Sequence, residues 1–350
     1  MAQESQEEGT PRYRMHERQQ WRPALASAFT LLAAAAAFRL PHPQGTYIWH
    51  KACRTADGLG GHIIKVRPYI ALAVRNHFTF VCNPEDWDTA LHYTGNFGSL
   101  FGCNGLSEVV GALASYDSVK NLDWRDFYAG EPPAAPGTVW ATKECKHMRP
   151  WGESWHWFRA QYWLVRKLER RDTQCWGDDE ARSHVVLAIR KGDDPLRSRA
   201  AESYLLVLEA VFSGRVPRVV LDENSTRVVV ISETDTQDRD IQRLNQSLGE
   251  RASFFIGAPE QSEEPARARF VRDLDCMAQS DVLVLSYSGM SDLAAAVQQP
   301  QGISLLVERR IAKRNTELPN TEKIFVNRDR GGVVETWPDE LPNALHVRVS

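Results

Sequence analysis

Hydrophobic residues in the first part of the chain alternate between short continuous runs and helical spacing. Gly45 to Trp49 predicts a short strand, Ile63 to Asn76 a helix, and Phe78 to Cys82 a second, buried strand. The segment Asp57 to Gly61 (Asp-Gly-Leu-Gly-Gly) lies between the first strand and the helix and predicts a glycine loop. Together these segments predict a βαβ unit.

A second alternation of the same kind follows further along the chain. Short β-branched runs predict strands, and helical spacing separates them. The predicted strands are Val185 to Ile189, Arg227 to Ile231 and Val282 to Ser286, and the predicted helices are Ser154 to Arg171, Arg199 to Phe212 and Asp238 to Leu248. This order implies a second parallel sheet with helices on both faces.

These patterns predict a two-lobed α/β protein. We expect a disordered tail over residues 1–22, a possible signal-anchor over 23–39, an N-terminal lobe over 40–150, a C-terminal lobe over 151–310 and a C-terminal extension over 311–350. The stretch from Asn83 to Thr138 is looser and rich in turn residues. It predicts active-site loops or a lobe boundary.

The segment near the N-terminus resembles a membrane signal-anchor. Four arginines precede a charge-free run from Pro23 to Phe38, which Arg39 closes. The run is shorter than the roughly 20 apolar residues that span a bilayer, so an ordinary alanine-rich helix is the alternative. Asn224 and Asn245 begin Asn-x-Ser/Thr triplets that would be glycosylated in the secretory lumen. We predict a type II protein of the Golgi or another secretory membrane, with a soluble cytoplasmic protein as the alternative.

Composition excludes two classes of function. The net charge of −3 leaves no basic excess for a nucleic-acid partner. The six cysteines form no CxxC pair and no His/Cys cluster, so no metal site is expected. The cysteines are compatible both with disulfides and with buried thiols.

Ligands bind at the carboxyl ends of strands in a parallel sheet, and the first such end here is basic. Arg190 and Lys191 follow the strand that ends at Ile189, and Asp193 comes after a glycine. Two adjacent cations would hold a pyrophosphate, for which the arginine fork is especially suited. A solvated basic turn is the alternative.

Two further strand ends carry polar side chains. Ser232 to Asp235 places Thr234 and Asp235 where they would border a base or ribose, although such a pattern is also typical of a helix N-cap. In the third region, a helix that begins near Asp273 and a strand lead into a Ser/Gly turn with Ser286 and Ser288. This turn opens another helix, so hydroxyls and backbone N–H groups would gather there as a phosphate site.

In their order along the chain, these elements resemble the α1,6-fucosyltransferases and the related GDP-fucose-dependent protein and nodulation fucosyltransferases. Trp155 to Tyr162 looks like the family's aromatic helix, and Ile189 to Asp193 is similar to its His-Val-Arg-Arg-x-Asp element. Asp273 to Ser288 is similar to the family's Asp-containing helix and paired Ser/Thr residues. Gly58 and Gly60 resemble the glycine loop of its acceptor-side lobe. The resemblance covers roughly residues 45 to 300.

The resemblance implies two facing Rossmann-like lobes, that is, a GT-B-like glycosyltransferase fold. It implies an inverting transfer of fucose from GDP-fucose to a glycan or protein hydroxyl, with no metal and no cofactor. Arg190 would hold the donor pyrophosphate. Asp273 and the turn from Ser286 to Ser288 would order the donor pocket, and the loop from Ser232 to Asp235 would border the nucleotide. Gly58 and Gly60 are expected to contribute to donor binding.

An inverting transfer needs a base that takes the proton of the acceptor hydroxyl. Asp57, at the glycine loop, is the first candidate base, and His62 is the second. The alternatives are a turn residue for Asp57 and a polar helix position for His62.

Two departures from the family pattern leave a different function open. Ala188 stands where the family has histidine, and Lys191 stands where it has a second arginine. A lysine supplies charge without the bidentate fork, so a catalytically inactive relative that binds a sugar or nucleotide is the alternative. A nicotinamide-dependent enzyme is disfavoured because the glycine loop lacks the third glycine of G-x-G-x-x-G.

Overall fold

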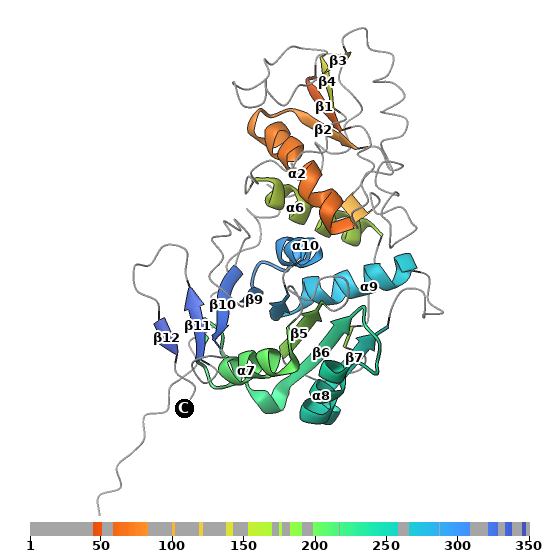
Figure 1. Ribbon diagram of the computed structural model, residues 1–350. Helices are drawn as coiled ribbons and strands as arrows, with labels where there is room; N and C mark the ends of the chain where they lie inside the picture. Colours follow the sequence, from red (N-terminus) through yellow and green to blue (C-terminus); the bar gives the residue numbers. More distant parts are fainter. Residues whose placement is uncertain are drawn as a thin grey trace, which may run out of the picture.

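Two separate β-sheets form the centres of two lobes in the computed structural model, one above the other in Figure 1. The structure describes residues 45–50, 59–82, 100–101, 119–121, 138–142, 153–169, 175–176, 183–190, 199–216, 218–257, 266–286, 288–308, 321–327, 333–337 and 345–347. The tail and possible signal-anchor predicted for residues 1–39 lie outside these ranges. Within them, no helix combines the length and apolar character needed to cross a membrane.

The smaller sheet contains the predicted βαβ unit. Its strands are β1 (Tyr47–His50), β2 (Thr79–Cys82), β3 (Val119–Asn121) and β4 (Val139–Thr142), in the spatial order β2-β1-β4-β3. All three neighbouring pairs are parallel. Helix α2 (Leu59–Arg75) connects β1 to β2 and packs against the sheet. The predicted strand, helix and strand are confirmed.

The larger sheet has the spatial order β12-β11-β10-β9-β8-β5-β6-β7. Its strands are β5 (Ser183–Ile189), β6 (Thr226–Ser232), β7 (Ala252–Ile256), β8 (Val282–Leu285), β9 (Ile303–Glu308), β10 (Thr321–Asn327), β11 (Val333–Trp337) and β12 (Leu345–Val347). The six strands from β7 to β10 are parallel, whereas β11 and β12 pair antiparallel. Counted along the chain, the parallel strands have the order 3-2-1-4-5-6 of the Rossmann fold.

Helices cover both faces of the larger sheet because its strands are apolar on both sides. On one face, Val185 and Leu187 pack under α7 (Ala201–Phe212) and α8 (Arg239–Leu248). On the other face, Val186 packs with α9 (Ala266–Gln279) and α10 (Gly289–Val297). Side chains alternate between faces along a strand, so a continuous run of buried residues requires two covering layers. The predicted α/β fold with two Rossmann-like lobes is confirmed.

The larger sheet continues beyond the boundary that the sequence interpretation set at residue 310. Strands β10, β11 and β12 extend it by pairing with β9 and with one another. Their sequences mix charged and apolar residues, as in Thr321–Asn327 (Thr-Glu-Lys-Ile-Phe-Val-Asn). They lack the continuous apolar run that marks the central strands, so the pattern did not reveal them.

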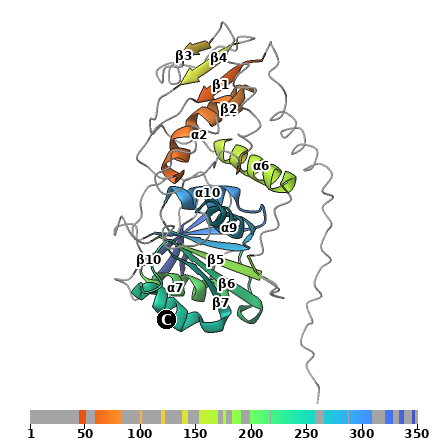
Figure 2. The same cartoon turned by 90° about the vertical axis from the view of Figure 1, so that its right-hand side faces the viewer.

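Three helices fill the space between the two sheets. Helix α6 (Glu153–Leu168) packs with α2 and α10, and Figures 1 and 2 show all three between the lobes. Trp155, Phe158 and Tyr162 of α6 are almost completely buried. They belong to one apolar cluster that runs from Ile48 in the smaller sheet to Val186 in the larger sheet. The lobes therefore share a hydrophobic core.

Two side chains of α6 also form hydrogen bonds with α10. The side chain of Arg159 donates to the carbonyl of Ala296 at 3.0 Å, and the indole of Trp163 donates to that of Val297 at 2.9 Å. Both acceptors lie in the last turn of α10, whose carbonyls have no partner within the helix. The two bonds thus satisfy the carboxyl end of α10 and set its position against α6.

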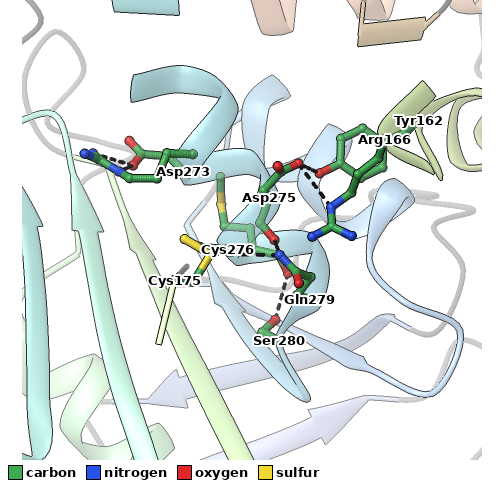
Figure 3. The surroundings of a disulfide bond; sticks show 10 residues. Tyr162, Arg166, Cys175, Asp273, Asp275, Cys276, Gln279 and Ser280 are labelled. Atoms are coloured by element: carbon green, nitrogen blue, oxygen red, sulfur yellow. Dashed lines mark hydrogen bonds and ion pairs between the residues drawn. A yellow bond between two sulfur atoms is a disulfide. The ribbon is translucent and has the colours of Figure 1, made fainter. Parts of the chain in front are cut away.

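A disulfide joins the segment after α6 to α9. Cys175 and Cys276 are bonded, with Cα atoms 5.3 Å apart and a sequence separation of 101. Beside the disulfide, the hydroxyl of Tyr162 donates to the buried carboxylate of Asp275, and Arg166 Nε lies 3.8 Å from the same carboxylate (Figure 3). Covalent and ionic contacts therefore fix α6 on α9.

We expect the disulfide to contribute strongly to stability, because it closes a long loop in the unfolded chain. Replacing both Cys175 and Cys276 by alanine should lower the free energy of unfolding in urea by about 2–4 kcal/mol. Peptide mapping of the unreduced wild-type protein should recover the two cysteines in one linked fragment. Recovery of both as alkylated thiols from protein unfolded without reductant would contradict the pairing.

Candidate functional site

The strand order of the larger sheet reverses between β5 and β8. The chain leaves β5 toward α7 on one face, and it leaves β8 toward α10 on the other face. In open parallel sheets, such a switch point leaves a crevice at the carboxyl ends of the strands, where ligands bind. The residues at this point are Arg190, directly after β5, and Ser286, directly after β8.

Two buried serines tie three strand ends together at this edge. The Ser286 hydroxyl accepts a hydrogen bond from the backbone N–H of Arg190 at 3.0 Å. On the other side of β5, the Ser232 hydroxyl at the end of β6 donates to the carbonyl of Ile189 at 2.9 Å. Both serines are 2% exposed. They hold the backbone on either side of Arg190 in one place, while the Arg190 side chain remains partly exposed.

Helix α10 begins at the same edge. Ser288 is its N-cap, and the Ser288 hydroxyl accepts from the N–H of Ser291 at 2.9 Å. The remaining N–H groups of a first helical turn have no partner within the helix, and the helix dipole adds positive charge there. The structure therefore brings Arg190, Ser286 and Ser288 together beside a helix N-terminus, as the sequence predicted.

Asp273 has a different environment from the one expected of a donor-site carboxylate. One Asp273 oxygen accepts from Arg272 at 2.8 Å, and the other lies 3.7 Å from Arg269. Both cations belong to α9, the helix that carries Asp273. Figure 3 shows Asp273 and Asp275 on opposite sides of this helix. In the structure, Asp273 thus neutralises and orients two arginines.

Those two arginines reach the ends of the neighbouring strands. Arg269 is buried and donates to the carbonyl of Ser232 at 3.2 Å, and Arg272 lies over the ring of Phe255 in β7 at 4.7 Å. Sequence reasoning missed both, because arginines spaced three residues apart on a helix are usually a solvated face. The i,i+4 spacing of Arg269 and Asp273 was the available signal.

Thr234 and Asp235 form a local turn. The N–H of Thr234 lies 3.4 Å from the Ser232 hydroxyl, and the exposed Asp235 carboxylate accepts from the N–H of Gln237 at 2.8 Å. The N-cap of α8 is Asp238, a few residues later. The loop therefore borders the edge of the sheet, and the hydrogen bonds of Thr234 and Asp235 to described residues stay within residues 232–238.

Several predicted site residues fall outside the described residues. These are Asp57, Gly58, Lys191 and Asp193. Gly60 and His62 lie in the first turns of α2, where only the backbone is described. Helix α2 begins at Leu59, so Gly60 and Gly61, which the sequence interpretation placed in a glycine loop, belong to the first turn of this helix.

A buried histidine ends β1, and sequence reasoning missed it. His50 is 1% exposed, and its ring centroid lies 5.1 Å from that of Tyr69 in α2. It pairs in register with Cys82 of β2 and Thr142 of β4, so it stands where the strand order of the smaller sheet reverses. Its position as the last residue of a strand before a glycine loop was the available signal.

A buried tyrosine was also missed. Tyr204, in the first turn of α7, is 0% exposed, and its hydroxyl has no hydrogen-bond partner among the described residues. Burial raises the pKa of the Tyr204 phenol well above its usual range, and the charge of Arg199 opposes the rise. The Ser286 hydroxyl lies near enough to oppose it as well, although the two do not meet hydrogen-bond geometry. Sequence reasoning placed this residue within the predicted helix from Arg199 to Phe212 and gave it no role.

Across the ranges that the structure describes, no three His, Cys, Asp or Glu side chains gather in a way that would hold a metal ion. The chain matches no protein-family model, and no curated protein matches it.

Solved structures show distant likenesses. A family 9 glycosyl transferase from Veillonella parvula is 11% identical, with 84% of this chain and 89% of that chain covered and a TM-score of 0.42. The fucosyltransferase NodZ from Bradyrhizobium is 11% identical, with 85% and 99% covered and a TM-score of 0.39. A mutant of Arabidopsis thaliana FUT1 in complex with GDP is 10% identical, with 89% and 78% covered and a TM-score of 0.42. At these TM-scores the likenesses carry no argument about this chain.

The environment of Asp273 makes a structural role testable. Asp273→Asn removes the carboxylate that two neighbouring arginines share, so we expect a loss of about 1–3 kcal/mol in the free energy of unfolding. The matched control is Asp235→Asn on the exposed turn, which should change stability by less than about 0.5 kcal/mol. Urea unfolding of both variants is the measurement, and equal stabilities would contradict the role of Asp273 in holding Arg269 and Arg272.

Proposed function

We propose that this protein is a glycosyltransferase that moves a sugar from a GDP-sugar donor to a hydroxyl group of a glycan or protein. The observation that carries the proposal is the switch point of the larger sheet. There the Ser286 hydroxyl holds the backbone of Arg190 at 3.0 Å, and α10 begins immediately beyond it. This arrangement supports binding of a diphosphate.

The charges at this edge match the chemistry of a nucleoside diphosphate. The Arg190 guanidinium would bind phosphate oxygens with two parallel N–H groups, and the N-terminus of α10 would offer backbone N–H groups. As the bond to the sugar breaks, negative charge accumulates on the leaving diphosphate. Cations and helix dipoles already in place stabilise that charge without reorganisation.

The proposed reaction inverts the configuration of the sugar. The acceptor oxygen forms a bond to the anomeric carbon, the bond from that carbon to the diphosphate oxygen breaks, and GDP leaves with the electron pair. A base takes the proton of the acceptor hydroxyl. Asp57 is our first candidate for this base and His62 our second, because both follow the carboxyl end of β1 in the smaller lobe. The proposal includes no metal and no cofactor.

Fucose is our proposed sugar because of the order of the motifs along the chain. The aromatic helix from Trp155 to Tyr162, the basic strand end at Arg190 and the serine turn at Ser286 follow one another as in the fucosyltransferases that the sequence resembles. The structure brings the last two to one edge.

A protein that binds GDP or a sugar without transferring it is the second candidate. Ala188, which replaces the family's histidine, lies in β5 between Ile231 and Leu285, so this strand end offers no imidazole. Binding of GDP without turnover of GDP-fucose would favour this candidate.

We also propose that the chain resides in the secretory pathway, anchored as a type II protein of the Golgi or another secretory membrane. Structural disulfides persist in oxidising compartments, and Cys175–Cys276 is such a bond. Asn224 and Asn245 are both exposed, so each side chain is accessible for the attachment of an N-linked glycan.

The location can be tested by glycosylation. Expressed from its own N-terminus in a secretory host, the protein should be membrane-bound and should shift on a gel after removal of N-glycans. Asn224→Gln and Asn245→Gln should each remove part of the shift. A soluble product without any shift would contradict the proposed location.

Donor binding is the direct test of the function. The full chain should bind GDP and GDP-fucose in a calorimeter, with much weaker binding of ADP and UDP. Arg190→Ala should weaken GDP binding about 10- to 100-fold, which corresponds to a lost charge-assisted hydrogen bond.

The matched control for that variant is Arg251→Ala. Arg251 forms a half-exposed pair with Glu223 just before the amino end of β7, so its loss should leave GDP binding unchanged. Absence of guanine-selective binding, or an equal loss of GDP affinity in the two variants, would contradict the proposed donor site.

A further inference from the structure

The Tyr204 hydroxyl is a polar group in an apolar part of the core. Tyr204 belongs to the apolar cluster that contains Ile189 of β5 and Val284 of β8. Its hydroxyl is fully buried and has no hydrogen-bond partner among the described residues. Burying a hydroxyl without a partner destabilises a folded protein, and phenylalanine would fill the same space without that penalty. A tyrosine at such a place therefore indicates a role in a state other than the unliganded one.

The surroundings of this hydroxyl point toward the proposed phosphate site. The Ser286 hydroxyl and the charges of Arg199 and Asp240 all influence the pKa of the Tyr204 phenol. Asp240, in the first turn of α8, accepts from the N–H of Ala201 at 2.8 Å and so fixes the start of α7, the helix that carries Tyr204. This bond fixes the helical turn that carries Tyr204.

The hydrogen-bonding capacity of Ser286 is only partly used. A serine hydroxyl has one donor proton and two acceptor lone pairs. One lone pair of Ser286 accepts from the backbone N–H of Arg190. Among the described residues, no acceptor takes its proton and no donor meets its second lone pair with hydrogen-bond geometry.

We infer that Tyr204 is a positioning residue for the donor's diphosphate and that it acts through Ser286. When the nucleotide binds, the Tyr204 O–H donates to the open lone pair of Ser286, and the Ser286 O–H donates to a phosphate oxygen. Hydrogen bonds in such a chain strengthen one another. Tyr204 itself does not touch the ligand, which agrees with its complete burial. The inference rests on the proposed function, because it names residues of the same site.

The test measures binding and stability in one set of variants of the full chain. Tyr204→Phe should weaken the binding of GDP about tenfold and leave the binding of guanosine unchanged. A tenfold loss is expected because the variant removes a neutral hydrogen bond that strengthens a charged one. Without ligand, the melting temperature of Tyr204→Phe should rise by about 2–4 °C, because the unpaired hydroxyl is gone. A purely structural role predicts the opposite sign for the melting temperature.

Two further variants sharpen the result. Ser286→Ala should also weaken the binding of GDP. Because the tyrosine acts through the serine, the double variant with Tyr204→Phe should bind GDP as tightly as Ser286→Ala alone. The matched control is Tyr162→Phe, which removes a buried hydroxyl that does have a partner, Asp275. It should lower the melting temperature and leave GDP binding unchanged.

The outcomes separate this inference from the function on which it rests. If the wild-type protein binds no GDP, the proposed function and the inference both fail. Two outcomes would overturn the inference alone when the wild type binds GDP. Either Tyr204→Phe binds GDP as tightly as the wild type, or its affinity for guanosine falls as much as its affinity for GDP. The comparison of Tyr204→Phe with the wild type decides this even if Ser286→Ala does not fold.

Discussion

The packing of α6 between α2 and α10 is the interaction on which the two-lobed architecture depends. The aromatic face of α6 is apolar, and its burial removes a large apolar area from water. Trp155, Phe158 and Tyr162 therefore join the cores of both lobes into one cluster. Directional bonds supplement this apolar contact. Side chains of α6 bond the last carbonyls of α10, and a disulfide joins the segment after α6 to α9. Helix α10 is thus held at its carboxyl end, whereas its N-terminus borders the candidate site.

The candidate site itself depends on small side chains at strand ends. Ser232 and Ser286 contribute little apolar area, but they bond the ends of β6, β5 and β8 to one another. Because their partners are backbone groups, the bonds set the path of the chain around Arg190 whatever the Arg190 side chain does. A preorganised edge of this kind suits an enzyme that stabilises charge on a diphosphate, since the groups need not move as the charge develops. Tyr204 and Arg269 add to the polar groups gathered at the edge.

Charge at this edge is balanced rather than simply positive. Arg269 and Arg272 share the carboxylate of Asp273, so α9 brings two cations but one net charge to the ends of β6 and β7. Arg190 is bonded to Ser286 through its backbone, so its guanidinium is not needed to hold the strand ends together. The shared carboxylate would keep the arginines of α9 in place when no ligand is bound.

By itself, the sequence determined the central strands, most of the helices and the basic and serine-rich strand ends, because apolar runs and turn residues report local burial directly. It also placed Arg190, Ser286 and Ser288 in one hypothesis, since the carboxyl ends of parallel strands must share an edge. Only the tertiary structure decided that Asp273 pairs with Arg269 and Arg272, that Cys175 bonds Cys276, that β10 to β12 continue the larger sheet, and that the Tyr204 hydroxyl is fully buried. These depend on which distant segments meet, and a one-dimensional pattern records the burial of a residue but not the identity of its neighbour.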